Sequence, residues 1–182
     1  MTRYGEAVRV LDPAVAGLVR DVPDFPTPGI LFKDITPLLG DAAAWRHTVD
    51  VFAQVVEEFA PTHVVGIEAR GFVLAAPIAY RLGIGFVPVR KPGKLPHATT
   101  GVGYDLEYGS DGLEVHLDAF GPGDRVVVVD DVLATGGTAA AASELVARTG
   151  AGVVGAGFLI ELDALAGRSR LPDHPVVSLL RY

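Results

Sequence analysis

Short, nearly continuous apolar runs alternate along the chain with stretches whose apolar residues have helical spacing. The apolar runs are typical of strands buried on both faces, and they lie at residues 63–67, 85–89, 125–129, 153–160 and 176–180. The helical patterns cover residues 13–20, 41–59, 71–82, 137–149 and 163–171. Because strands and helices alternate, we expect βαβ units in an α/β fold, with a mainly parallel central sheet flanked by helices on both faces.

Two segments depart from this alternation. Residues 22–40 contain several prolines and a glycine, which exclude regular structure, yet Phe25 and Phe32 are apolar, so the segment is predicted to pack over another part of the molecule. Composition alone supports a plain covering loop and a binding loop equally. Residues 92–103 are rich in Pro, Gly and Thr and are predicted to form a mobile loop. Apolar and polar residues alternate over 113–117, which indicates a half-exposed strand or hairpin arm.

The strand at 125–129 leads into the densest group of chemically capable residues. Asp130 and Asp131 come at its end, and a loop at the start of helix 137–149 follows, made of Ala134, Thr135, Gly136, Gly137 and Thr138. Glycine lets the backbone approach an anion, and the free N–H groups and dipole at a helix start favour phosphate. No lysine follows the glycines, which excludes a Walker loop. Two acids beside such a loop suit a ribose 5-phosphate, and the alternative is a strand that merely ends in Asp-Asp before a glycine turn.

Residues 126–138, Val-Val-Val-Val-Asp-Asp-Val-Leu-Ala-Thr-Gly-Gly-Thr, resemble the phosphoribosyl-pyrophosphate (PRPP) motif of type I phosphoribosyltransferases. Three further stretches resemble the adenine phosphoribosyltransferases of that family, at residues 25–39, 66–72 and 90–96, with Tyr-Asp-Leu-Glu-Tyr-Gly following at 104–109. The resemblance implies one domain over residues 1–182, with an N-terminal hood at about 22–40 and a mobile loop at about 92–103. It also implies purine salvage, in which adenine and PRPP give AMP and pyrophosphate.

The resemblance implies catalytic roles for three residues. Glu107 would be the acid/base that acts on a purine ring nitrogen, although by itself it is better interpreted as an exposed strand glutamate. Arg70 follows a strand exit and Lys94 lies in a loop framed by Pro and Gly, and both would stabilise the departing pyrophosphate. The alternative for both is a solvated surface cation. Mg²⁺ would be bound mainly through the oxygen atoms of PRPP and pyrophosphate, without dedicated protein ligands.

Binding roles follow in the same way. Asp130, Asp131 and the loop 134–138 would bind the ribose and its phosphate, with further substrate contacts from Ala69 and Arg90. Adenine would lie between Phe32 and Val132, where the family usually has a leucine in place of the valine. Backbone groups near Leu31 and Lys33 would pair with the 6-amino group and the adjacent ring nitrogen of adenine, which predicts discrimination against 6-oxo purines.

Composition narrows the remaining functional classes. The 182-residue chain has a formal charge of −7 and a pI of about 5.1, which argues against a nucleic-acid partner. No apolar stretch reaches the roughly 18 residues that a membrane helix needs, and cysteine is absent, so we expect a cytoplasmic protein without a membrane partner. The nearly all-apolar helix 71–82 and the family's usual state predict a homodimer. The alternatives are transfer to another purine base and a non-catalytic PRPP-sensing regulator, which would need an effector surface.

Overall fold

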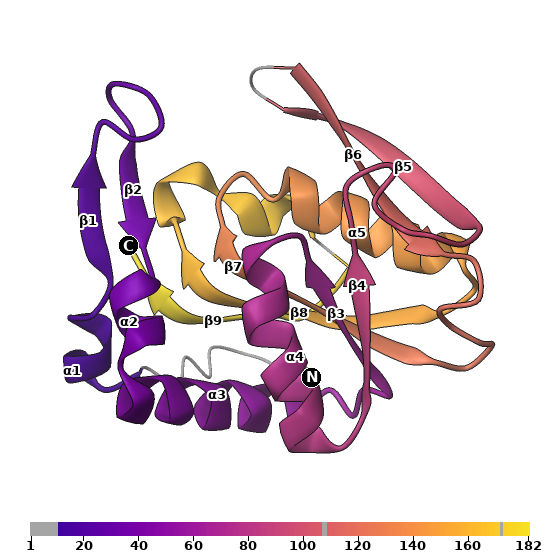
Figure 1. Ribbon diagram of the computed structural model, residues 1–182, viewed down its shortest axis with the longest axis horizontal. Coiled ribbons are helices and arrows are strands. Elements are labelled where there is room, and N and C mark those ends of the chain that lie inside the picture. The colour runs from indigo at the N-terminus through magenta and orange to yellow at the C-terminus, as the bar shows by residue number, and fades with distance from the viewer. Residues whose placement is uncertain (1–10, 107–108, 172) are drawn as a thin grey trace.

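The computed structural model describes residues 11–106, 109–171 and 173–182 (Figure 1). Its centre is a parallel sheet of five strands in the order β4-β3-β7-β8-β9. The strands are β3 (His63–Ile67), β4 (Gly85–Val89), β7 (Arg125–Leu133), β8 (Gly152–Glu161) and β9 (Val176–Arg181). Each apolar run predicted as a strand is therefore a strand of one parallel sheet, as the alternation indicated.

Helices cover both faces of this sheet. α3 (Ala42–Glu57) and α4 (Arg70–Leu82) contribute to one apolar cluster, and α5 (Gly137–Arg148) contributes to a second on the opposite face. In Figure 1, α3 lies below the sheet and α5 above it. The fully buried valines of β7 alternate between the two clusters, with Val127 in the first and Val128 in the second. The continuous apolar sequence of this strand is explained by a core on each side.

The helix predictions are confirmed for the three long helices. Asp41 caps α3, and its Oδ1 accepts hydrogen bonds from the N–H groups of Ala43 and Ala44 at 3.0 and 2.9 Å. The first predicted helix is shorter than expected, since α1 (Pro13–Ala16) ends before a strand begins at Arg20. The last is wrong as a single helix. It consists of two 3₁₀ turns, η1 (Asp163–Leu165) and η2 (Gly167–Arg170), separated by Ala166 with a φ of +50°.

The prediction that prolines exclude regular structure from residues 22–40 is wrong. β1 (Arg20–Pro23) and β2 (Leu31–Asp34) form an antiparallel hairpin, and α2 (Thr36–Gly40) follows. The prolines fit because they occupy the end of β1, the connecting turn and the first turn of α2, where a missing N–H costs no ladder bond. The hood, predicted at about 22–40, begins with β1 at Arg20, so from here on the hood denotes residues 20–40, which stand at one end of the sheet in Figure 1.

The predicted loop at residues 92–103 is also partly wrong. β5 (Thr99–Leu106) pairs with β6 (Gly109–His116) in a second antiparallel hairpin, so only residues 92–98 remain as a connection. Val102 anchors β5 because it is buried in the cluster beneath α5. The alternating stretch 113–117 is confirmed as a hairpin arm as far as His116. Within the described residues, no helix combines the length and the apolar character that crossing a bilayer requires.

Candidate active site

The candidate site lies where β3 and β7 separate. β3 pairs with β7 only as far as Val129, whereas β8 pairs with β7 on to Leu133. α4 continues from β3 toward one face of the sheet and α5 continues from β7 toward the other. A crevice outside the carboxyl ends of two such strands is the usual ligand position in open α/β sheets. Figure 1 shows this edge of the sheet between the hood and the β5–β6 hairpin.

Asp130 and Asp131 lie within the strand, not after it as the sequence pattern suggested. Asp131 is only 4% exposed. Burial raises the pKa of Asp131 and, with the charge of Asp131 as the second cause, raises the pKa of Asp130 well above its usual range. The N–H of Asp131 donates to Asp130 Oδ1 at 3.0 Å. Asp131 Oδ2 is buried and accepts no hydrogen bond from the described residues, so it presents an acceptor to a ligand hydroxyl.

The loop after β7 has the character of an anion site. Residues 134–138, which we call the phosphate loop, line a small cavity of about 70 Å³ together with Asp130, Val132, Leu133, Ala139 and Phe158. Gly136 has a φ of +81° and precedes the first turn of α5. Gly136 stands at the N-cap and has no side chain to cap that turn, and the N–H of Ala140 donates to the Gly136 carbonyl at 2.9 Å. The N–H groups of the first turn therefore remain for a phosphate.

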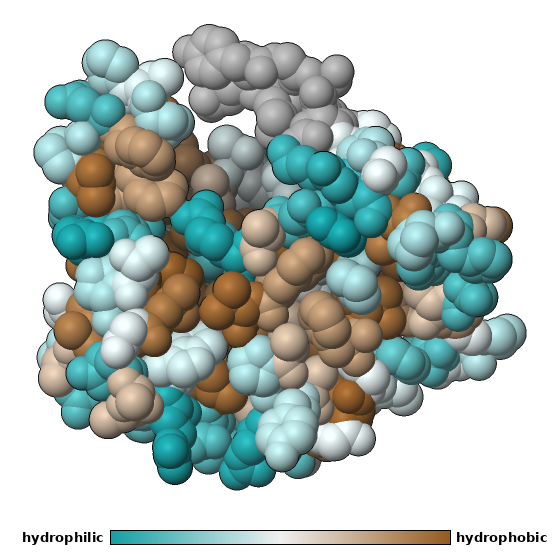
Figure 2. Space-filling view, in the orientation of Figure 1, coloured by the Kyte–Doolittle hydropathy of each residue, from teal (hydrophilic) through white to brown (hydrophobic). Residues whose placement is uncertain are grey.

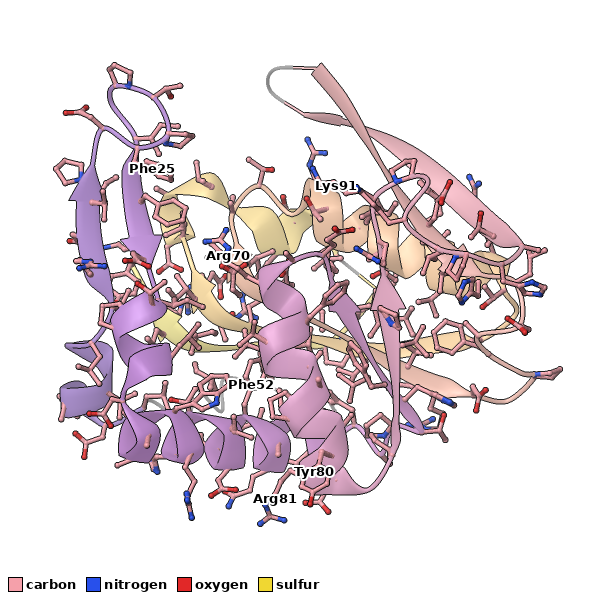
Figure 3. All side chains as sticks on the ribbon, viewed as in Figure 1. Phe25, Phe52, Arg70, Tyr80, Arg81 and Lys91 are labelled. Carbon is pink, nitrogen blue, oxygen red and sulfur yellow. The ribbon has the colours of Figure 1, made fainter. Side chains whose placement is uncertain are left out.

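Arg70 connects the acid pair to the hood. Its Nε lies 3.0 Å from Asp131 Oδ2, in an ion pair without hydrogen-bond geometry. Its guanidinium carbon lies 5.0 Å from the centre of the Phe32 ring, a cation–π contact. Figure 3 shows the side chain extending from the first turn of α4 toward the hood. The side chain is 46% exposed, so a cationic group stands beside the acids and within reach of a ligand.

Arg90 has a protein partner at this edge. Its Nε and Nη2 donate to the two Glu68 carboxylate oxygens at 3.3 and 3.2 Å, and Nη1 donates to the carbonyl of Lys94 at 3.1 Å. The bonds from Arg90 and from the Lys91 N–H lower the pKa of Glu68. Arg90 therefore ties the exit of β3 to the loop that carries Lys94, whose own side chain is exposed. The Glu68–Ala69 peptide between this pair and Arg70 is cis.

The hood presents one aromatic face and one open strand edge. Phe32 is half-buried and packs edge-on against Phe25, with ring centres 5.0 Å apart. Lys33 is directed elsewhere, since its Nζ lies 2.6 Å from Asp21 Oδ1 and 4.0 Å from the centre of the Tyr182 ring. β2 pairs with β1 alone among the described strands, so its other edge leaves backbone groups for recognition.

Comparison with known proteins identifies this arrangement. A family model described as the phosphoribosyl transferase domain matches residues 41–180. The chain is 61% identical over 167 residues to the adenine phosphoribosyltransferase of Acidothermus cellulolyticus, covering 92% of this chain and 94% of that one. It is 58% identical over 165 residues to the enzyme of that name from a Synechococcus species, covering 91% and 96%. The chain belongs to the adenine phosphoribosyltransferase family.

Solved structures agree with this family at the level of the backbone. The adenine phosphoribosyltransferase of Thermoanaerobacter pseudethanolicus superposes with a TM-score of 0.91 at 49% identity, covering 93% of this chain and 99% of the other. The enzyme of Saccharomyces cerevisiae, in a structure that contains adenine and an imino-altritol bisphosphate, gives 0.88 at 42% identity, covering 92% and 97%. The fold expected from the resemblance is therefore confirmed.

The residues expected for this family are distributed unevenly in the described structure. One crevice brings together Asp130, Asp131, Arg70 and the phosphate loop. The Phe32 ring lies beside this crevice, in contact with the guanidinium of Arg70. Val132 lines the same cavity. Glu107 lies outside the described residues, so its acid/base role stays a prediction.

Sequence reasoning missed two residues that shape the site. Glu68 fixes the side chain of Arg90 by accepting two hydrogen bonds from it. Nothing in the sequence indicates this pairing, because the two residues are 22 positions apart. Gly71 allows close approach, because a methyl group there would lie 2.8 Å from Asp130 Oδ1. The glycine itself was visible beside Arg70 in the sequence, but its neighbour across the crevice was not.

Proposed function

We propose that this protein transfers the 5-phosphoribosyl group of PRPP to adenine, giving AMP and pyrophosphate in purine salvage. The observation that carries the proposal is the acid pair of β7, with Asp131 buried, beside the first turn of α5 behind Gly136, in a chain that matches adenine phosphoribosyltransferases over more than 90% of its length. The phosphate loop receives the 5′-phosphate. Asp130 and Asp131 accept hydrogen bonds from the 2′- and 3′-hydroxyls, which gives a hydrogen-bond donor to Asp131 Oδ2, an oxygen that among the described residues has only its ion pair with Arg70.

The acid pair has a second use during bond cleavage. As pyrophosphate leaves C1 of the ribose, positive charge builds on the ring, and two carboxylates held near it stabilise that charge. Arg70 is the cation nearest the acids in the described structure and, with Lys94 from the neighbouring loop, stabilises the departing pyrophosphate. Glu107 acts as the acid/base at a purine ring nitrogen as N9 attacks C1, and it accepts the ring N–H proton that adenine loses when the new C–N bond forms. These roles follow the family resemblance and the positions of Arg70 and the acids.

Mg²⁺ is part of the proposal as an ion carried by the substrate. The described residues contain no group of three or more His, Cys, Asp or Glu side chains that could hold a metal by themselves. The donor set still suits the ion, because carboxylate oxygens and water are ligands that Mg²⁺ prefers, and it commonly takes only one or two carboxylates alongside phosphate oxygens. When bound, the ion would neutralise charge on the diphosphate. Asp130 and Asp131 are the residues that would assist in holding it.

Base selection is assigned to the hood. Phe32 covers one face of adenine and Val132 the other, while backbone groups of β2 near Leu31 and Lys33 pair with the 6-amino group and adjacent ring nitrogen. The engagement of the Lys33 side chain with Asp21 and Tyr182 supports a backbone role at this position. A 6-oxo purine reverses the donor and acceptor, and leaving two buried polar groups unpaired costs about 1–3 kcal/mol each.

We also infer that the protein is a cytoplasmic homodimer. Val73 and Tyr80 of α4 are 42% and 90% exposed and Phe86 of β4 is 36% exposed, so α4 and β4 carry large apolar and aromatic groups at the surface. Figure 2 shows apolar residues gathered over α4 and β4 on this face of the molecule. Such a patch is suited to burial against a second copy. Light scattering at micromolar concentration should give about twice the 19.0 kDa chain mass, and a species of 19.0 kDa alone would contradict the dimer.

The decisive test of function is product formation with each base in turn. Purified protein, MgCl₂ and PRPP are incubated with adenine, hypoxanthine or guanine, and nucleotides are resolved by chromatography. AMP should form from adenine, with kcat/KM about 10⁴-fold above that for hypoxanthine. Comparable values would overturn the backbone selection, and PRPP binding without turnover of any base would favour the sensing regulator. Omission of MgCl₂ with excess chelator should abolish turnover.

A further inference from the structure

The segment between β8 and β9 lies directly against the phosphate loop. A methyl group added at Gly136 would overlap the carbonyl oxygen of Gly167, and one added at Gly167 would overlap the carbonyl oxygen of Ala134. Two backbone stretches about thirty residues apart are thus in contact, and only glycine fits on either side. Gly136 also needs its positive φ, whereas the requirement at Gly167 comes from close packing, against the Ala134 carbonyl and the Leu133 side chain.

An ion pair next to Gly167 fixes its position. Arg168 Nε and Nη2 donate to the two carboxylate oxygens of Glu161 at 2.6 and 2.7 Å, and Nη1 donates to the carbonyl of Val176 at 2.6 Å. The Glu161 side chain is 4% exposed, at the end of β8. Bidentate pairs of this kind fix geometry as well as adding energy. On the other side, Leu171 is buried in the core beneath α5, so Gly167 is held from both directions.

The phosphate loop has few other supports. The N-cap residue of α5 is Gly136, which offers no side-chain hydrogen bond to the first turn. Within the part of the chain that the structure describes, the hydroxyls of Thr135 and Thr138 make no hydrogen bond. The direction of the N–H groups that would meet a phosphate therefore depends on what stands behind the loop, and Gly167 stands there.

We propose that Arg168 and Glu161 are positioning residues for PRPP, which hold Gly167 against the phosphate loop and so set its N–H groups for the 5′-phosphate. The inference rests on the proposed phosphoribosyl transfer and extends it to two residues outside the crevice. Arg168 acts through Gly167, because Glu161 and the Val176 carbonyl already occupy its guanidinium. The role is specific to the phosphate end of the site, so adenine binding should not depend on it.

The test compares PRPP and adenine in variants that loosen or displace this support. Arg168→Met combined with Glu161→Gln removes both charges and avoids leaving Glu161 buried without its partner. Gly167→Ala pushes on the Ala134 carbonyl while the ion pair remains. For both we expect the KM for PRPP, and its Kd with MgCl₂ by calorimetry, to rise about 10- to 100-fold. The KM for adenine should stay within about twofold, and Arg168→Lys should lie between wild type and the double variant.

Arg125→Met is the matched control. Arg125 also joins two segments through guanidinium bonds, to the carbonyls of Ala60 and Phe59 at 2.8 Å each, but at the opposite edge of the sheet. It should lower Tm without changing the Kd for PRPP. An unchanged PRPP Kd in the folded double variant and in Gly167→Ala, an equal rise in the adenine KM, or an equal PRPP effect of Arg125→Met would each overturn the proposal. If wild type binds PRPP but makes no AMP, the proposed reaction fails while the Kd comparison still decides this inference.

Discussion

The two ends of β7 carry aspartates in opposite circumstances. At the amino end, Asp124 Oδ2 accepts from the Gly121 N–H at 2.7 Å and Oδ1 accepts from the Thr62 hydroxyl at 3.0 Å. These partners, the Gly121 N–H first, hold its pKa below the usual range. At the carboxyl end, burial raises the pKa of Asp130 and Asp131, and one oxygen of Asp131 has no hydrogen-bond partner within the described residues.

The difference separates polar groups that complete the fold from polar groups kept for a ligand. A partnered acid at the amino end stabilises the protein by itself. A desolvated pair of acids destabilises the ligand-free protein, and the loss is offset only when hydroxyls or a cation arrive. One strand can carry both kinds of acid because β3 pairs with β7 at its amino end but not beyond Val129.

The largest effect is expected from Asp130→Asn with Asp131→Asn. Removing both negative charges takes away the stabilisation of the ribose cation, so kcat/KM should fall by about 10³-fold or more. The ligand-free Tm should not fall and should rise by a few degrees, on the order of 2–4 °C per kcal/mol, because two desolvated charges disappear. Steady-state kinetics and thermal melts measure the two quantities. Full activity in the folded double variant would remove the acids from the ribose site.

The phosphate loop should respond next in magnitude. Gly137→Val places a branched side chain where backbone N–H groups must meet the phosphate, and the KM for PRPP should rise at least about tenfold. Gly123→Ala is the control at the amino end of β7, where φ is +90° and the space around a methyl group is open. It should cost about 1–2 kcal/mol of stability through backbone strain and leave the KM unchanged. An unchanged PRPP KM in folded Gly137→Val would exclude the loop from phosphate binding.

A smaller effect is expected from the aromatic ring of the hood. Phe32→Ala should raise the KM for adenine about tenfold through loss of stacking, on the order of 1–3 kcal/mol for a base on an aromatic ring. The KM for PRPP should change less than about twofold. Phe120→Leu is the counterpart at the amino end, where the Phe120 ring packs edge-on against His63 with centres 5.6 Å apart. That variant should lower Tm alone, and an equal rise in both Michaelis constants of Phe32→Ala would contradict a base-specific role.

The smallest effect is a difference in pH dependence between the two ends. The folded pKa of Asp130 is raised, so its stabilising contribution is complete below the unfolded value of about 3.8 and is lost as pH rises through the folded pKa. The folded pKa of Asp124 is lowered, so its contribution is present above that value and is lost as pH falls below it. The Tm of wild type should therefore drop further below that of Asp130→Asn as pH rises from 4, whereas it should rise further above that of Asp124→Asn over the same range, with both differences smallest in strong acid. Parallel curves for the two variants would contradict the comparison.

The local sequence pattern was sufficient to predict the structure where residues that are neighbours in the sequence are also neighbours in space. The valines of β7, the capped start of α3 at Asp41 and the glycine loop before α5 each signal their structure within a few residues. The PRPP motif belongs to this class, because acids, loop and helix start follow one another along the chain. It predicted a phosphate site at the end of the strand and a resemblance to type I phosphoribosyltransferases without knowledge of the other strands, whereas the resemblance to the adenine enzymes came from three further stretches.

Pattern failed where distant segments decide the outcome. The prolines of the hood concealed a hairpin because β1 and β2 stabilise each other across a turn, and residues 99–103 join β5 because β6 returns to pair with them. The aspartates were expected beyond the strand, yet β8 extends the ladder past them. No local sequence feature indicates such pairings, because a strand needs a partner strand that can lie far away in the sequence.

The sequence by itself determined the parallel α/β architecture, the position of the phosphate loop and the two acids, because periodicity and glycine placement act over short range. Only the tertiary structure decided the state of those groups. Burial raises the pKa of Asp131, and the neighbouring Arg70 charge opposes that rise. The separation of β3 from β7 opens the crevice. The contact of Gly167 with Gly136 likewise joins segments thirty residues apart. Desolvation and close packing depend on everything that surrounds an atom, and a linear sequence does not state what those surroundings are.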